Sequence, residues 1–410
     1  MTEQAKVPAI RFAGFTDPWE QRKLGELFEE SDERASDREI LSVSVANGIY
    51  PASESDRETN PGASLANYKI VHFGDVVYNS MRMWQGAVDA SRYDGIVSPA
   101  YVVARPNSEV YARFFARLLR QPMLLKQYQQ VSQGNSKDTQ VLKFDDFASI
   151  GISMPASENE QRRIGGFFDR LDSLITLHQR KYDKLVIFKK SMLEKMFPKD
   201  GESVPEIRFA GFTDPWEQRK FGDCFEFLKS NTLSRAGLNG ENGTARNVHY
   251  GDILIKFGDC LDGERSDLPF ITDDTVLPKF AGSILREGDV IFADTAEDEA
   301  AGKCVELRKL PKEPTISGLH TIPARPRFFF GTGYLGHYLN SDAYHRQLLP
   351  LMQGIKVISV SKAALQDTQV RFPGLSEQAA IGAALSEIDN LITLHQRKRL
   401  SIRQRSPVWS

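Results

Sequence analysis

The sequence lacks the patterns that mark disulfide-rich, membrane-spanning and metal-binding proteins. Its three cysteines, Cys224, Cys260 and Cys304, lie far apart and form no CxxC pair, which indicates reduced thiols in a cytosol. Its seven histidines show no metal-ligand spacing. No apolar run approaches the ~18 residues of a membrane helix, and the opening MTEQAKVPAI does not match a secretory signal. We therefore expect a cytoplasmic protein without a metal site.

The charge balance points to no particular partner. The 52 basic and 54 acidic residues leave a net charge of −2. A strongly basic chain would have indicated nucleic acid, but this one neither suggests nor excludes it. The 410 residues, of which 41% are hydrophobic, predict a globular chain of about two or three domains.

A long internal repeat is the main feature of the sequence. Residues 8–23 and 205–220, which share IRFAGFTDPWEQRK, agree at fifteen of sixteen positions, and residues 160–181 and 377–398, which share LITLHQRK, agree at thirteen of twenty-two. Between these shared blocks the two copies diverge. Shared blocks around divergent inserts indicate a constant scaffold that presents two different surfaces.

Each opening block predicts a short surface helix. Asp17 and Asp214 can cap this helix, prolines follow at its first position, and Glu20 and Glu217 stand where a capping box places its acid. We expect the helix to brace a domain rather than to contact a ligand.

Each closing block predicts a long helix. The first runs from Glu158 to Phe197 and carries apolar residues at steps of four and three, the pattern of a coiled-coil seam. The second loses the pattern after Lys398, which leaves its distal part in doubt. Antiparallel pairing of the helices would give the chain a two-fold pseudo-symmetry. The seam residues are Ile164, Phe168, Leu171, Ile175, Tyr182 and Leu185 in the first helix, and Ile381, Leu385, Ile388 and Ile392 in the second.

The inserts predict mixed α/β domains. We expect strands at 40–45, 75–79 and 98–104 with a helix at 111–131, and strands at 252–256, 289–293 and 320–324 with a helix at 334–348. The predicted fold class is therefore mixed α/β, with two globular domains separated by long helices. The predicted bounds are 1–157 and 199–374 for the domains, and 158–198 and 375–410 for the helices.

No motif in the sequence identifies an enzyme. Gly331, Gly333 and Gly336 form GxGxxG, but no acid follows where a dinucleotide site needs one, so the start of a helix in a loop is the preferred interpretation. The glycine-lysine pair at 302–303 lacks the rest of a phosphate loop, and the Asn-Pro-Pro-aromatic motif of an amino-methyltransferase does not occur. We therefore name no catalytic residue.

Polar loops in both inserts carry side chains suited to nucleic acid. After the strand at 75–79, the segment includes an arginine that can read guanine, amides that can read adenine and a tryptophan that can stack. A glutamine-glycine loop follows a helix in both copies. Solvated turns are the simpler alternative. The candidate DNA contacts are Asn79, Arg82, Trp84, Gln85, Gln133, Asn135, Lys137, Lys256, Gln353 and Lys356.

One segment argues against DNA contact. Residues 259–299 hold twelve acids and three bases, a net charge of −9. If the second insert binds DNA, most of this stretch should face away or bind a basic partner, although a few acids could accept hydrogen bonds from cytosine amino groups. A scaffold that binds proteins, without DNA specificity, therefore stays open as an alternative function.

The shared blocks resemble those of a known family. RFAGFTDPWEQRKLGE at 11–26 and ENEQRRIGGFFDRLDSLITLHQRKYDKL at 158–185 are similar to blocks of the specificity (S) subunits of type I restriction-modification systems. The order of variable domain, helix, variable domain and helix is also similar, and the resemblance covers nearly the whole chain.

The resemblance implies a function in DNA recognition. It implies two target recognition domains, each reading half of a split, asymmetric site on double-stranded DNA. The helices would act as a spacer and dock two modification (M) subunits, which hold S-adenosylmethionine and methylate adenine. Two restriction (R) subunits would add translocation and cleavage with ATP and Mg²⁺. The S subunit itself would hold no cofactor and no catalytic residue.

Overall fold

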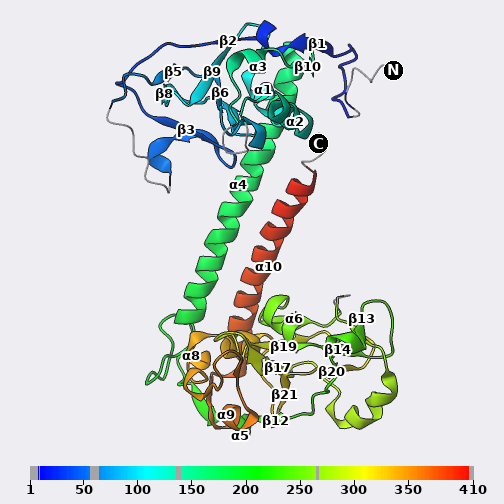
Figure 1. Ribbon diagram of the computed structural model, residues 1–410. Coiled ribbons are helices and arrows are strands. Elements are labelled where there is room, and N and C mark those ends of the chain that lie inside the picture. Colours follow the sequence, from blue (N-terminus) through cyan, green and yellow to red (C-terminus); the bar gives the residue numbers. More distant parts are fainter. Residues whose placement is uncertain (1–7, 9, 56–63, 135–139, 265–266, 406–410) are drawn as a thin grey trace. The chain divides into compact units, whose positions relative to one another are not determined.

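The computed structural model describes residues 8, 10–55, 64–134, 140–264 and 267–405, without the side chains of 274, 276 and 403–405. The chain divides into two compact units, residues 1–177 with 399–410, and residues 178–398. Helix α4 (Glu158–Lys195) is continuous across the boundary between them (Figure 1). Among the described residues, none of the helices has the length and hydropathy required to cross a membrane.

An antiparallel sheet with the strand order β2-β9-β6-β7 forms the core of the first unit. Successive strand residues point to opposite faces, so Tyr78 packs with Phe115 of α1 whereas Val77 packs with Leu41 of β3 on the other face. The elements are β1 (Glu20–Lys23), β2 (Phe28–Glu30), β3 (Leu41–Ser44), β4 (Gly48–Pro51), β5 (Lys69–Val71), β6 (Val76–Asn79), β7 (Val88–Ala90), β8 (Gly95–Val97), β9 (Tyr101–Pro106), α1 (Ala112–Leu118), α2 (Pro122–Val131), α3 (Phe144–Ala148) and β10 (Gly151–Met154).

The second unit repeats this sheet and extends it. Its order is β12-β21-β17-β19-β15, and β15 pairs parallel to β19 while the other pairs are antiparallel. The elements are β11 (Glu217–Lys220), α5 (Phe221–Cys224), β12 (Phe225–Phe227), β13 (Leu238–Asn239), β14 (Arg246–Val248), α6 (Tyr250–Ile255), β15 (Cys260–Asp262), β16 (Phe270–Ile271), β17 (Val290–Ala293), β18 (Thr295–Ala296), β19 (Cys304–Arg308), β20 (Thr315–Ser317), β21 (Thr321–Pro326), α7 (Tyr334–Leu339), α8 (Asp342–His345), β22 (Ile358–Ser359), α9 (Lys362–Asp367), β23 (Gln369–Phe372) and α10 (Leu375–Arg405).

The opening blocks form strands rather than helices. Strand β1 pairs antiparallel with β10, with Glu20 opposite Met154, and β11 pairs with β23, with Glu217 opposite Phe372. The predicted capped helix is therefore wrong in both repeats. Pairing with a strand that is distant in the sequence outweighs the local capping signal, because tertiary context routinely overrides propensity.

One buried ion pair joins the two shared blocks in each repeat. Arg11 holds Glu160 through two hydrogen bonds of 2.6 Å, and Arg208 holds Glu377 through two of 2.7 Å. The glutamates are only 1% and 2% exposed. Such bidentate, charge-assisted pairs fix geometry as well as charge. Each opening block is thereby tied to the start of a long helix, and the same pair of blocks is joined in both repeats.

The helices and strands within the inserts correct three predictions. The predicted helix at 111–131 is two helices, because Pro122 begins α2, and the one at 334–348 is divided into α7 and α8. Residues 252–255 of the segment predicted as a strand at 252–256 lie in helix α6, whose start is capped by the ring of His249. The strands predicted at 40–45, 75–79, 98–104, 289–293 and 320–324 are confirmed, with bounds that differ by up to three residues.

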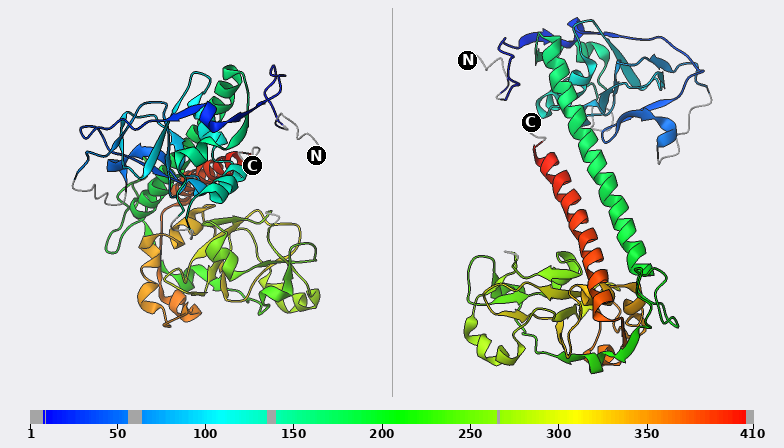
Figure 2. Two further views of the ribbon diagram at one scale, coloured as in Figure 1. Left: turned by 45° about the horizontal axis from the view of Figure 1, so that its top comes forward. Right: turned by 180° about the vertical axis from the view of Figure 1, so that it is seen from behind.

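The seam predicted for the long helices coincides with their least exposed side. All ten seam residues, from Ile164 to Leu185 in α4 and from Ile381 to Ile392 in α10, are buried or half-buried. Helix α10 continues past Lys398 to Arg405, so its distal part is helical. Within the second unit, the C-terminal half of α4 runs antiparallel to α10 (Figure 2), as predicted.

Candidate nucleic-acid interface

Three loops of the first unit meet where β6 ends. The backbone N–H of Ser80 donates to Ala100 (3.2 Å), and the Ser80 carbonyl accepts from Leu142 (2.9 Å). Leu142 follows a hairpin in which Gln133 and Val141 exchange two backbone hydrogen bonds of 3.0 and 2.8 Å. We call residues 80–86, 98–100, 133–134 and 140–141 the first junction.

The second unit builds the same junction from different residues. The Asp294 N–H donates to His320 (3.1 Å), its carbonyl accepts from Val360 (2.8 Å), and Gln353 and Ser359 exchange bonds of 3.0 and 2.8 Å. Residues 294–302, 318–320 and 353–359 form this second junction. Each of the four backbone hydrogen bonds named for the first junction thus has its counterpart in the second.

Glycines fix the same backbone turns in both junctions. Gly86 and Gly302 close the loops after β6 and β17 with φ of 91° and 84°, and Gly134 and Gly354 open the two hairpins with φ of 139° and 119°. Only glycine adopts this region without steric cost. The scaffold is therefore constant while its side chains differ.

The structure places the candidate residues of the first unit around this junction. Arg82 is exposed. Trp84 is half-buried against the core and donates its indole N–H to the Met81 carbonyl (3.2 Å), and Gln85 beside it is also half-buried. Trp84 therefore supports the loop, whereas the side chains of Arg82 and Met81 are exposed.

Of the remaining candidates of the first junction, two have hydrogen-bond partners within the chain and two lie outside the described residues. The Asn79 side chain accepts from the Met81 N–H (3.0 Å), and the Gln133 amide donates to Asp146 (3.0 Å). Asn135 and Lys137 lie outside the described residues.

In the second unit, the hairpin candidates lie at the junction and Lys256 lies beside it. Gln353 and Lys356 are exposed on the hairpin, where Ile355 is 99% exposed. Lys256 follows α6, and its ammonium lies 3.0 Å from Asp252.

One residue of the second junction that the sequence does not single out is His320. His320 has a φ of 54°, its ring contacts Tyr250 edge-on at 5.4 Å, and its Nδ1 lies 3.3 Å from Asp294 Oδ1. The alignment of SPAYVVARP with SGLHTIPARP places this residue at a strand entry, but the approach of Asp294 and Tyr250 depends on the fold.

Part of the acidic segment at 259–299 lies on the second junction. Some of its acids are neutralised internally, as Asp289 is by Arg325 at 2.7 Å. Glu297, Asp298 and Glu299, however, are exposed on the second junction. The expectation that most of the segment faces away from DNA stays a prediction, and these three acids are the part of the segment that lies on the junction.

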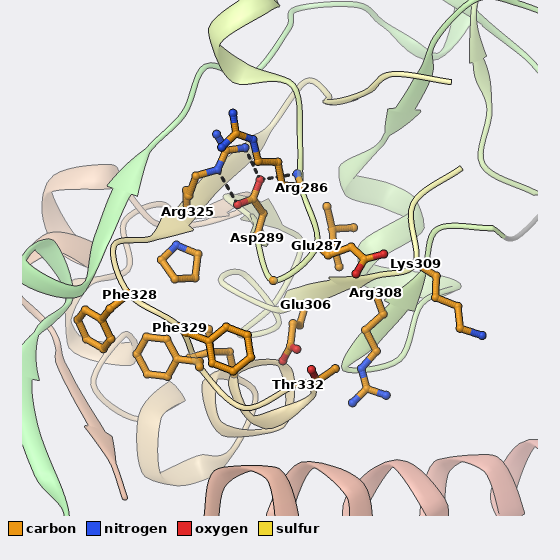
Figure 3. Close-up of a pocket in the computed structure, with 15 residues that line it drawn as sticks. Arg286, Glu287, Asp289, Glu306, Arg308, Lys309, Arg325, Phe328, Phe329 and Thr332 are labelled. Carbon is orange, nitrogen blue, oxygen red and sulfur yellow. Dashed lines mark hydrogen bonds and ion pairs between the residues drawn. The ribbon is translucent and has the colours of Figure 1, made fainter. Parts of the chain in front are cut away.

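The backbone N–H groups of the GxGxxG segment bind a carboxylate of the same chain, that of Glu306. Glu306 accepts the backbone N–H groups of Gly333 and Gly336, and Gly333 is the N-cap of α7. Burial raises the pKa of Glu306, and the two N–H groups partly offset this rise. Figure 3 shows Glu306 and Arg308 along a pocket of about 560 Å³. This arrangement favours the interpretation of the GxGxxG segment as the start of a helix in a loop, and it does not favour a dinucleotide site.

A second buried cluster has the donor groups of a cation site but already holds a lysine. Asp259, His337 and Asp389 bring their ligand atoms within 4.8 Å of one another. The Lys189 ammonium lies 2.6 Å from Asp259 and 2.5 Å from Asp389. Burial opposes its charge, but the two carboxylates raise the pKa of Lys189. The ammonium therefore takes the place that a metal ion would occupy.

Together, a duplicated α/β domain, a long helix in each repeat and matched loop junctions define a class of proteins built to present two variable surfaces. Residues 16–186 match the family model described as the type I restriction modification DNA specificity domain. The first repeat of the chain is thus similar to the DNA specificity domain of type I restriction-modification systems.

Two curated proteins are similar to longer stretches of the chain. The chain is 24% identical over 268 residues to the type I restriction enzyme MjaVIII specificity subunit of Methanocaldococcus jannaschii, an alignment that spans 62% of this chain and 59% of the relative. It is 21% identical over 360 residues to the putative MjaX specificity subunit of the same organism, across 82% of this chain and 76% of the relative. The chain thus matches less than two thirds of the length of the MjaVIII subunit.

A solved structure shares the fold. The S subunit of a type I restriction-modification system from M. genitalium aligns with a TM-score of 0.51 and 12% identity, over 98% of this chain and 97% of that one. At this identity the likeness concerns the fold alone.

Proposed function

We propose that the chain is the DNA-recognition subunit of a type I restriction-modification complex and reads a bipartite, asymmetric site. The matched junctions are the observation on which this proposal rests. Backbone hydrogen bonds at equivalent positions hold the two junctions in the same arrangement, but the side chains on them differ between the repeats. Each junction would read one half-site through base edges, while phosphate contacts position the domain. The family match does not favour the alternative of a scaffold without DNA specificity.

The long helices would dock two adenine-methyltransferase subunits. Helix α4 leaves several large apolar side chains exposed, among them Phe167, Leu174, Leu177, Phe188 and Ile187, which is 70% exposed. Exposed apolar side chains of this size are what a helix that docks another protein would present. We propose residues 1–157 and 199–374 as the two target recognition domains. Residues 158–198 and 375–410 would be the two spacer helices.

Catalysis would reside in the partner subunits. The chain would supply no catalytic residue and bind no cofactor. The modification subunits would hold S-adenosylmethionine, and two restriction subunits would use ATP and Mg²⁺. The complex would act in the cytoplasm, where its DNA substrate lies.

Methylome sequencing tests the proposal directly. Cells that express the modification subunit should gain adenine methylation at one split, asymmetric motif only when this chain is also expressed. Filter binding of random duplexes to the assembled complex should select the same motif. Methylation without the chain, or binding without sequence preference, would contradict the proposal.

A further inference from the structure

The second junction contains a histidine whose backbone is strained. With a φ of 54°, His320 lies in the left-handed region, which is sterically unfavourable for a residue with a Cβ atom. Ala100, the counterpart of His320, is not among the described residues with positive φ. Strain of this kind persists where the surrounding structure imposes it, and it clusters at ligand-binding sites.

The imidazole of His320 is held from two sides and remains open to solvent. Tyr250 of α6 contacts the ring edge-on at 5.4 Å, and Asp294 Oδ1 lies 3.3 Å from Nδ1. The Lys303 ammonium anchors α6 to the junction by donating to the Leu254 and Phe257 carbonyls. The His320 side chain is nevertheless 48% exposed.

The carboxylate next to this ring is incompletely satisfied. Asp294 Oδ1 is buried and accepts no hydrogen bond from the described residues. Its nearest cationic or imidazole nitrogen is Nδ1 of His320. A buried acceptor without a donor is costly, so a small rotation that lets Nδ1–H donate to Asp294 is favourable. A carboxylate at one ring nitrogen fixes the tautomer and leaves the other nitrogen free as an acceptor.

We propose that His320 is a base-reading residue of the second domain, and that its Nε2 accepts a hydrogen bond from the exocyclic amino group of an adenine or a cytosine. These two bases present an amino donor in the major groove, whereas guanine and thymine present acceptors there. The inference rests on the proposed function and assigns it a residue in the second half-site. Arg82 at the first junction is a donor, so the two junctions would read bases of opposite hydrogen-bonding character.

The test uses the full chain assembled with the modification subunits and compares two substitutions. His320→Ala and His320→Gly both remove the imidazole, but glycine also relieves the left-handed backbone. We expect both variants to lose discrimination at one base pair of one half-site, with affinity for the original site lowered roughly five- to hundredfold. The other half-site should stay unchanged. The melting temperature of His320→Gly should exceed that of His320→Ala.

His72 provides a matched control for the His320 substitutions. His72 of the first unit is 43% exposed and lies 3.5 Å from Glu33, so His72→Ala should leave the second half-site unchanged. Unchanged motifs in both His320 variants would overturn the inference, as would equal weakening on all sequences, which indicates a phosphate contact. Loss of discrimination in His320→Ala but not in His320→Gly would make the role structural. A wild-type complex without any motif would instead refute the proposed function.

Discussion

His178 and His395 occupy equivalent positions in the two repeats and meet each other across the helix pair of the second unit. Their Nδ1 atoms lie 2.8 Å apart, and their ring centroids lie 5.1 Å apart. One imidazole must donate and the other accept, so the contact requires that at most one ring be protonated.

This pair predicts that acid weakens the helix pair. Burial, and then the charges of His178, Lys181 and Lys398, lower the pKa of His395. A histidine with a lowered folded pKa binds fewer protons when folded, so its stabilisation is complete above its unfolded pKa of about 6.5 and is lost as the pH falls below it. The melting temperature should therefore decrease as the pH is lowered from about 7.5 to about 5.5. The fall should be shallower in His395→Asn and unchanged in the control His72→Asn. Equal slopes in all three proteins would contradict this account.

Removal of the Lys189 ammonium should destabilise the second unit. In Lys189→Met, two carboxylates of the cluster, Asp259 and Asp389, lose their shared cation. Breaking such a buried pair typically costs about 3–5 kcal/mol. Chemical denaturation should show this loss, and adding Asp389→Asn should recover part of it. Lys184→Met, an exposed substitution on the same helix, should change the free energy of unfolding little. A loss no greater than that of Lys184→Met would show that the cluster does not stabilise the unit.

Arg82 should contribute to reading the first half-site. A bidentate arginine–guanine contact is worth roughly 1–3 kcal/mol, so Arg82→Ala should weaken the complex on its own site about ten- to hundredfold. Base preference should relax in one half-site only, with the melting temperature nearly unchanged. Arg34→Ala, at an exposed arginine of the same unit, is the control. An unchanged methylation motif with full activity would remove Arg82 from the recognition surface.

Helix length should set the spacing between the half-sites. Insertion of four residues after Lys181 adds about one turn, or ~6 Å, which corresponds to about two base pairs of DNA. The His178–His395 and Lys189–Asp389 contacts lie on opposite sides of this point. A matching insertion after Ile392 of α10 should therefore preserve both contacts. The motif should gain one or two unspecified base pairs while both half-sites stay the same. An unchanged gap would show that the helices do not set it.

The sequence predicts the elements that follow local periodicity and misses those that depend on distant partners. The seam from Ile164 to Leu185 is visible because each seam residue is placed by the same helical step. The strand at Glu20 is not, because its partner lies at Met154 and the local signal favours a helix cap. Likewise, Arg82 is suggested by its neighbours in the chain. His320 becomes a candidate only when Asp294 and Tyr250 are brought to it.

Exchange of one insert tests most directly whether each repeat reads one half-site. Residues 24–157 are replaced by the corresponding insert of another family member, which leaves the opening block and its Arg11–Glu160 pair in place. The modified chain is expressed with the modification subunit, and the methylated motif is sequenced. We predict that one half of the motif changes to that of the donor, while the other half and the gap stay the same. A motif that changes in both halves would contradict independent reading by the two domains.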